Sequence, residues 1–163
     1  MPRIDKTNYY LDIAATVLER STCLRRHYGA IVVKNDEIIA SGYNGAPRGR
    51  KNCIDLGHCV RDELGIPRGE RYEMCRSVHA EANAIISAAR RDTIGGIMYI
   101  VGRDAGTGAL LPDSSSCPMC KRLVINAGIR KVVVRNTPEK FTVFEVQQDW
   151  VDQDDSLSGV FGY

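Results

Sequence analysis

The segment "CPMC" contains two cysteines, Cys117 and Cys120, whose spacing indicates chemistry more directly than any other pair in the chain. Two thiols at this spacing suit a redox pair, and they equally suit two ligands of a zinc ion. A helix that begins at the first cysteine stabilises a thiolate in either case. Spacing alone leaves both interpretations open, so the choice depends on whether further ligands exist elsewhere.

The segment "HAE" supplies such a ligand in His79, and it places a carboxylate at Glu81. One imidazole and two thiolates leave the fourth tetrahedral position open for water, which is the mark of a catalytic zinc site. Glu81 points away from His79 around a helix, yet near a helix end it can reach that water and carry its proton. We therefore predict a catalytic zinc with the ligands His79, Cys117 and Cys120, and Glu81 as the catalytic residue.

The hydrophobic pattern predicts the elements that must position these residues. We expect three helices at 9–20, 77–91 (with Ser77 as its N-cap) and 117–128, a hairpin over 28–45 with its polar tip at 34–37, and strands at 95–102, 129–135 and 140–147. The strand at 129–135 should pair in parallel because a helix precedes it. This order predicts a three-layer α/β/α fold with a mixed, mostly parallel five-stranded sheet.

Composition limits the classes of protein. The 163 residues, 44% of them hydrophobic, suit a single domain over 1–163, with an acidic tail at about 149–163. A net charge of +2 argues against binding long nucleic acid through bulk charge. No stretch approaches the roughly 18 apolar residues of a membrane span, and the N-terminus lacks the apolar run of a signal peptide. We expect a cytoplasmic protein without a membrane partner, whose six cysteines are thiols or metal ligands.

Two further groups of polar residues are candidates for substrate binding. Asn44 follows a strand in "GYNGAP", where its amide can contact a ligand or satisfy its own turn. The segment "RSTCLRR" combines hydroxyls and guanidinium groups that suit a monophosphate, although a charged helix end would also leave the arginines in solvent. The four candidates in this segment are Ser21, Thr22, Arg25 and Arg26.

The segment 44–76 is long, polar and rich in cysteine, and a loop of this length is usually functional or held by a cross-link. A second, structural zinc with four protein ligands would hold it. The alternative is free thiols in a reducing cell. Five residues compete for the four positions: Cys23, Cys53, His58, Cys59 and Cys75.

Taken together, these motifs resemble the zinc-dependent cytidine and deoxycytidylate deaminases, most of all the deoxycytidylate deaminases. The resemblance covers about residues 4–135 and rests on "RSTC", "GYNGAP", "HAEANAI" and "CKRLVINAGIRKVVV". It implies a cytidine-deaminase-like fold, in which zinc-activated water attacks C4 of a cytosine nucleotide such as dCMP and Glu81 protonates N3 and then the leaving amine. It also implies substrate contacts from Asn44, to the sugar, and from Ala80, and it implies a homo-oligomer.

The sequence departs from the family pattern beside the first cysteine. Ser116 stands where the pattern has proline, and the loop 101–116 is longer than expected. Its charged residues Arg103, Asp104 and Asp113 could cover the pocket, replace contacts to the base, or disfavour a phosphate. Two alternatives therefore accompany dCMP deamination. One is a deaminase of another nucleobase, nucleoside or heterocycle, and the other is a non-catalytic zinc-stabilised nucleotide-binding module. Glu81 favours catalysis, because a purely structural metal needs no carboxylate beside it.

Overall fold

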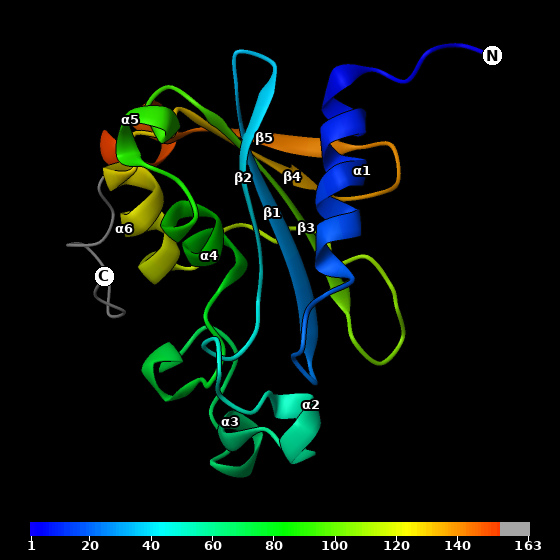
Figure 1. Ribbon diagram of the computed structural model, residues 1–163, viewed down its shortest axis with the longest axis vertical. Coiled ribbons are helices and arrows are strands. Elements are labelled where there is room, and N and C mark those ends of the chain that lie inside the picture. The colour runs from blue at the N-terminus through cyan, green and yellow to red at the C-terminus, as the bar shows by residue number, and fades with distance from the viewer. Residues whose placement is uncertain (154–163) are drawn as a thin grey trace.

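A computed structural model describes residues 1–153 of the chain. Its centre is a five-stranded sheet in the order β2-β1-β3-β4-β5, with α1 on one face and α4 and α6 on the other (Figure 1). The three-layer α/β/α prediction is therefore confirmed. The strands are β1 (Arg26–Lys34), β2 (Glu37–Tyr43), β3 (Ile97–Asp104), β4 (Lys131–Arg135) and β5 (Phe141–Glu145). The principal helices are α1 (Lys6–Leu18), α4 (Ala80–Ile86), α5 (Arg90–Thr93) and α6 (Pro118–Asn126).

The sheet is mixed, but the expectation that it is mostly parallel is wrong. Only the β3–β4 pair is parallel among the described strands, as predicted for a strand that follows a helix. The β1–β2, β1–β3 and β4–β5 pairs are antiparallel. The physical reason is connection length, because β1–β2 and β4–β5 are joined by short turns and such turns reverse the chain.

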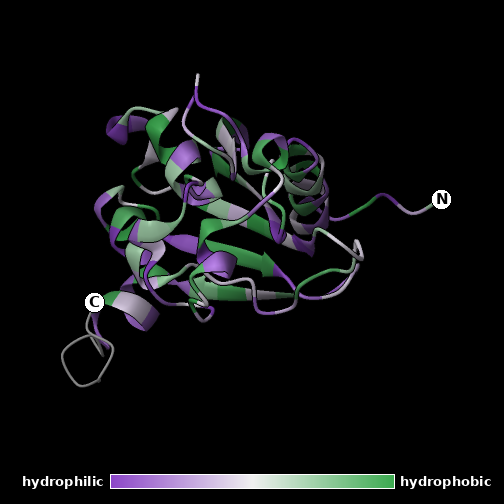
Figure 2. Cartoon of the chain, turned by 90° about the horizontal axis from the view of Figure 1, so that it is seen from below, coloured by the Kyte–Doolittle hydropathy of each residue, from purple (hydrophilic) through white to green (hydrophobic). Residues whose placement is uncertain are grey.

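The β1–β2 hairpin turns at Asn35 and Asp36, which have φ values of 52° and 60°. Two left-handed residues in succession match the twist of the strands they join, and Asn and Asp tolerate this conformation. Strand β1 is buried on both faces. Ala30 and Val32 contact the core beneath α4 and α6, whereas Ile31 and Val33 contact the core beneath α1. Figure 2 shows these hydrophobic strands at the centre of the molecule, between the flanking helices.

The two helices that carry the candidate metal ligands begin at those ligands. Helix α6 starts at Pro118 with Cys117 as its N-cap, and Gly128 beyond its end has a φ of 73°, as predicted. Helix α4 starts at Ala80 with His79 as its N-cap, so the assignment of Ser77 as the cap is wrong. Val78 exchanges two backbone hydrogen bonds with Gly45, which keeps the chain extended up to His79.

Helix α4 also approaches the sheet unusually closely. A Cβ atom on Gly42 of β2 would lie 2.4 Å from the carbonyl oxygen of Ala80 and 2.4 Å from the backbone nitrogen of Ala84. Only glycine leaves room for this contact. The first turn of α4 is therefore held at a fixed depth against β2.

The segment 44–76 contains three short helical pieces instead of a continuous loop. They are α2 (Cys53–Leu56), α3 (Val60–Glu63) and the 3-10 turn η1 (Tyr72–Met74). All three lie at one end of the sheet, below α4 in Figure 1. After β5 the chain forms a short π-helical piece, η2 (Val146–Val151), over the first part of the predicted acidic tail; the rest of that tail from residue 154 lies outside the described residues. No helix in residues 1–153 has the length and apolar character needed to cross a membrane.

Candidate active site

His79, Cys117 and Cys120 meet at the N-terminal ends of α4 and α6. The Nδ1 atom of His79 lies 3.5 Å from Sγ of Cys117 and 3.4 Å from Sγ of Cys120. Tetrahedral zinc with ordinary Zn–N and Zn–S bonds holds such nitrogen and sulfur atoms about 3.6 Å apart. In residues 1–153 this is the one group of three or more potential metal-ligand side chains whose atoms all lie within 4.8 Å of one another. The donor set and its spacing therefore fit zinc with an open fourth position.

The electrostatics of the two thiols differ. A hydrogen bond with Cys120, together with the nearby His79, lowers the pKa of Cys117 to about 4. The hydrogen bond with Cys117 and burial raise the pKa of Cys120. Burial lowers the pKa of His79, but its interactions with Cys117 outweigh that effect, so that the pKa rises overall. The cluster thus holds one thiolate before a metal binds, and zinc takes thiolates as ligands.

Glu81 lies in the first turn of α4 and is only 6% exposed. Burial raises the pKa of its carboxyl group, and its electrostatic neighbours are His79 and Cys117. A carboxyl group that is desolvated beside a metal centre is suited to exchange a proton near neutral pH. The structure thus brings the predicted proton carrier to the predicted ligands.

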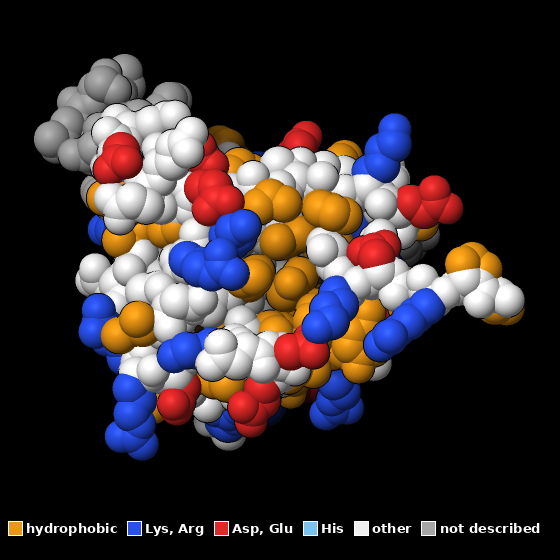
Figure 3. Space-filling view, turned by 90° about the horizontal axis from the view of Figure 1, so that it is seen from above, with side chains coloured by type: hydrophobic (Ala, Val, Ile, Leu, Met, Phe, Trp, Pro, Cys, Tyr) orange, Lys and Arg blue, Asp and Glu red, His pale blue; other side chains and the backbone are white. Residues whose placement is uncertain are grey.

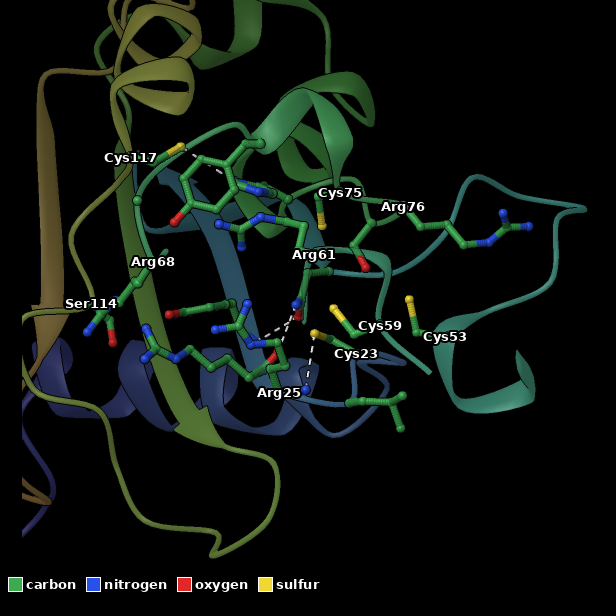
Figure 4. Close-up of a pocket in the computed structure, with 18 of the residues that line it drawn as sticks. Cys23, Arg25, Cys53, Cys59, Arg61, Arg68, Cys75, Arg76, Ser114 and Cys117 are labelled. Atoms are coloured by element: carbon green, nitrogen blue, oxygen red, sulfur yellow. Dashed lines mark hydrogen bonds between the residues drawn. The ribbon is translucent and has the colours of Figure 1, made fainter. Parts of the chain in front are cut away.

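These groups line a cavity of about 250 Å³ between the end of the sheet and the segment 44–76. His79, Glu81 and Cys117 form one part of its wall, and Tyr28 and Tyr72 add aromatic surface. Five arginines also line it: Arg25, Arg26, Arg61, Arg68 and Arg76. Figure 4 labels all of them except Arg26. The cavity therefore combines a metal centre with a strongly cationic wall, which favours an anionic ligand.

Sequence reasoning did not identify Arg61, Arg68, Arg76 or Tyr72 as site residues. The sequence feature that could have pointed to them is the group of four arginines among the cysteines of "CVRDELGIPRGERYEMCR". This segment has no hydrophobic periodicity, so the sequence does not show which way its side chains point. Only the fold of this segment over the cavity makes them part of the site.

Of the residues predicted to bind substrate, Asn44 lies at the cavity wall but already has several hydrogen-bond partners. Asn44 lines the cavity, but its Oδ1 atom accepts hydrogen bonds from Ser21 Oγ at 2.6 Å and from the backbone N–H of Tyr28 at 2.8 Å, and its Nδ2 donates to the carbonyl oxygen of Arg26 at 2.9 Å. The backbone of Gly45, the residue after Asn44, pairs with that of Val78, the residue before His79. This pairing holds Asn44 beside the metal-ligand cluster. One amide N–H of Asn44 remains available to a ligand.

Of the predicted phosphate residues, Arg25 and Arg26 line the cavity, whereas Ser21 and Thr22 do not. The hydroxyl of Thr22 donates to Asn52 Oδ1 at 3.0 Å, and the hydroxyl of Ser21 is used by Asn44. Ala80 is completely buried and is not part of the cavity wall. The roles proposed for Ser21, Thr22 and Ala80 therefore have no direct contact with the cavity to support them.

The loop 101–116 does not cover the cavity with its charged residues. Arg103 pairs with Glu19, the carboxylate of Asp104 accepts hydrogen bonds from its own turn, and the N–H of Asp113 donates to Asn136 Oδ1 at 3.1 Å. Only the two serines at the end of the loop, Ser114 and Ser115, line the cavity. Arg103 therefore reaches the end of α1, and the backbone N–H of Ala105 donates to the carbonyl oxygen of Arg25 just before β1, so these parts of the loop lie away from the cavity wall.

The remaining cysteines gather on the side of the cavity away from Cys117 (Figure 4). Burial raises the pKa of Cys53, and the neighbouring thiols Cys23, Cys59 and Cys75 raise it further. Their sulfur atoms are more widely spaced than those of the His79 centre, since no three of them meet the 4.8 Å separation. His58 is turned elsewhere, because its Nδ1 atom lies 2.9 Å from the carboxylate of Glu63.

A second hollow lies at the opposite end of the sheet, beside the hairpin tip. Figure 3 shows hydrophobic side chains on this end of the molecule with lysine and arginine around them. The cations that line the hollow already have partners: Lys6 pairs with Asp36 at 2.8 Å, Lys34 donates to the carbonyl of Arg91, and Arg130 donates to the carbonyl of Gly95. It contains no metal-ligand group of the kind found around His79, so the chemistry lies in the first cavity.

A three-layer α/β/α fold with an open His-Cys-Cys centre and a buried carboxyl group defines a zinc-dependent hydrolase class. Residues 4–136 match the family described as "Cytidine and deoxycytidylate deaminase zinc-binding region". The chain therefore belongs to the cytidine and deoxycytidylate deaminase family.

Three relatives illustrate the match. The deoxycytidylate deaminase of Mycobacterium phage D29 is 36% identical over 138 residues, which are 82% of this chain and 96% of that protein. The deoxycytidylate deaminase of Schizosaccharomyces pombe is 33% identical over 126 residues, or 77% of this chain, and the chain spans only 35% of its length. A crystal structure of dCMP deaminase from the cyanophage S-TIM5, in complex with dCMP and dUMP, aligns with a TM-score of 0.55 at 26% identity, covering 82% of this chain and 85% of that one.

Proposed function

We propose that the protein is a zinc-dependent hydrolase that converts dCMP to dUMP and ammonia. The observation that carries the proposal is the buried His79–Cys117–Cys120 cluster, with Glu81 beside it, at the wall of an arginine-lined cavity. The cluster is suited to hydrolytic deamination, and the arginines favour a nucleotide substrate over a nucleoside or a free base. The names of the phage relatives support the same substrate.

In this proposal His79, Cys117 and Cys120 are the zinc ligands. Zinc bound there would supply Lewis-acid activation of water at neutral pH. The protein's own part is to hold the cytosine ring beside the ligands and to move protons. Glu81 accepts a proton from the attacking water and delivers it to N3 of the ring. It then takes the proton of the new C4 hydroxyl and passes it to the amine, so that the C4–N bond breaks, ammonia leaves and the C4 carbonyl forms. Asn44 contacts the sugar through its remaining amide N–H.

A screen of ammonia release tests the substrate. The zinc-loaded protein is assayed with dCMP, CMP, deoxycytidine, cytosine, adenine and guanine at equal concentrations. We expect a higher kcat/KM with the two nucleotides than with the nucleoside and bases, which leave the arginines without an anion. Among the nucleotides we expect dCMP to be preferred, in line with the names of the relatives. Release from non-nucleotides alone would contradict the proposed substrate and favour the alternative of another base or heterocycle. Binding of dUMP without any turnover would favour the non-catalytic module.

We also propose that Cys23, Cys53, Cys59 and Cys75 bind a second, structural zinc. Three of these residues stand at the ends of the short helices in the segment 44–76: Cys53 begins α2, Cys59 precedes α3, and Cys75 follows η1. A metal that drew these ends together would stabilise a segment with little core of its own. His58 is excluded from this ligand set because it pairs with Glu63 and is exposed.

Replacement of one thiol tests the second site. We expect Cys59→Ser to reduce the zinc content from two ions to one per chain and to lower the melting temperature, while the ion at His79 remains. His58→Ala is the matched control, and it should leave both values unchanged. Elemental analysis and differential scanning calorimetry measure the two quantities. A Cys59→Ser variant that still holds two zinc ions per chain would disprove this ligand set.

The expected homo-oligomer and cytoplasmic location are also part of the proposal. Exposed apolar side chains on α4 and α6, Ile86 and Leu123, support an interface between copies of the chain. None of the six cysteines forms a disulfide, which supports a reducing compartment.

A further inference from the structure

Arg61 differs from the other arginines of the cavity wall because it is buried. Its side chain is only 6% exposed, it lines the cavity, and no carboxylate within residues 1–153 forms an ion pair with it. Arg135, the other buried arginine among these residues, pairs with Asp12 at 2.7 Å. A buried guanidinium without a paired carboxylate is costly, and an anionic ligand in the cavity would supply the missing partner.

The guanidinium of Arg61 is held in one orientation by its surroundings. Its Nη2 atom donates to the carbonyl oxygens of Pro67 and Glu70, both at 2.8 Å, and its Cζ atom lies 4.6 Å from the centre of the Tyr72 ring. Its Nε atom is buried and has no acceptor among the described residues. Arg61 thus has unused donor capacity on a side chain whose position is already fixed, which lowers the entropy lost when a ligand binds.

The position of Arg61 relative to the metal centre suits a nucleotide. The Tyr72 ring lies edge-on to the imidazole of His79, with 4.8 Å between the ring centres. Arg61 and His79 therefore both contact the Tyr72 ring, which places the guanidinium in the same cavity as the candidate metal ligand. Figure 4 shows Arg61 reaching across the middle of the cavity, with Arg25 and Arg68 on the same side as its guanidinium.

The other cavity arginines are less suited to discriminate a phosphate, because none of them is buried. Arg25 already pairs with Asp62 at 3.1 Å, and Arg68 is exposed. Arg26 and Arg76 are half-buried, and Arg76 already donates to the carbonyl of Lys51. Exposed cations attract an anion weakly because water and salt screen them.

We propose that Arg61 is the residue that makes the enzyme specific for a nucleotide over a nucleoside, by binding the 5′-phosphate of the substrate. This inference rests on the proposed function and moves the main phosphate contact from the "RSTCLRR" segment to the cysteine-rich segment. In it, Tyr72 is a positioning residue whose ring lies under the guanidinium and contacts His79 in a T-shaped arrangement.

The test compares nucleotide with nucleoside in zinc-loaded enzyme. We expect Arg61→Met, which keeps side-chain length and removes the charge, to lower kcat/KM for dCMP by about 10- to 100-fold, mainly through KM. Turnover of deoxycytidine should change by less than about threefold, because it carries no phosphate. The same comparison at equilibrium, with the Kd values of dUMP and deoxyuridine from calorimetry, applies even where nucleoside turnover is slow.

Two further variants make the result decisive. Arg71→Met is the matched control, since Arg71 belongs to the same segment, is exposed and lies outside the cavity wall. It should keep the wild-type ratio of the two substrates. Arg61→Lys keeps a charge without the planar fork, so it should fold where Arg61→Met does not and should lower the ratio by about tenfold.

Equal losses for nucleotide and nucleoside, with a lower zinc content or melting temperature, would overturn the inference and make Arg61 a counter-charge for the nearby thiols. An unchanged ratio in whichever variant folds would overturn it as well. The proposed function is tested separately, because wild-type enzyme that binds dUMP through Arg61 but releases no ammonia from dCMP would contradict only the reaction.

Discussion

Replacement of Glu81 by glutamine is expected to reduce kcat for dCMP by about 10³-fold while the protein keeps its zinc. Glutamine has nearly the same shape and remains buried in the first turn of α4, but it cannot accept or release a proton near neutral pH. The carboxyl group is only 6% exposed, so bulk water cannot easily take over the transfer. Steady-state ammonia release and elemental analysis measure the two quantities.

A glutamate outside the cavity provides the comparison. Glu73 lies in η1 near the same cavity, but it is exposed and pairs with Arg71. Glu73→Gln should therefore retain wild-type kcat. If Glu81→Gln released ammonia at the wild-type rate, another group would have to carry the proton, and the assigned mechanism would be wrong.

Loss of one thiol at the catalytic centre is the second change with a large expected effect. Cys117→Ser should lose the zinc held by His79 and reduce turnover by more than about 100-fold, since a serine hydroxyl does not ionise at neutral pH as the Cys117 thiol does. Two protein ligands are too few to hold a tetrahedral zinc ion firmly. The loss of activity should therefore result from loss of zinc and not from unfolding of the protein.

The mechanism of that loss can be separated from misfolding. Cys117 caps α6 by accepting a hydrogen bond from the backbone N–H of Cys120, and serine is itself a good N-cap. Circular dichroism should therefore remain close to wild type while zinc content falls by one ion per chain. Chelation of zinc from the wild-type protein should reproduce the loss of activity, and re-addition should restore it only in the wild type. A Cys117→Ser variant with full zinc and full activity would exclude Cys117 as a ligand.

Much of the fold was readable from local patterns. Helix α6 lies within its predicted range because Pro118 and Gly128 mark its ends, and the β3–β4 pair is parallel because a helix intervenes. The direction of β1 against β3 was not readable. It depends on which edge of the hairpin the later strand meets, and that choice is made by packing between residues far apart in sequence.

The N-terminus of α4 shows the same limit at the level of one residue. Ser77 has the right side chain for an N-cap, but the backbone pairing of Val78 with Gly45 keeps the chain extended past it, and the helix begins only after His79. A local preference was overruled by a contact made across 33 residues of chain, between 45 and 78.

The "CPMC" and "HAE" segments by themselves determined the expected chemistry, because zinc hydrolysis needs particular side-chain types and both segments lie where helices begin. Their meeting within hydrogen-bonding distance was a consequence of the fold, but it was predictable from the requirement for three ligands. Only the tertiary structure decided which residues line the substrate cavity. The segment 44–76 has no periodicity to orient its side chains, and its folding over the end of the sheet buries Arg61 against Tyr72 while Ser21 and Thr22 are left outside the cavity. Burial and the lack of a paired carboxylate are properties of the surroundings, which is why no local pattern singled out that arginine.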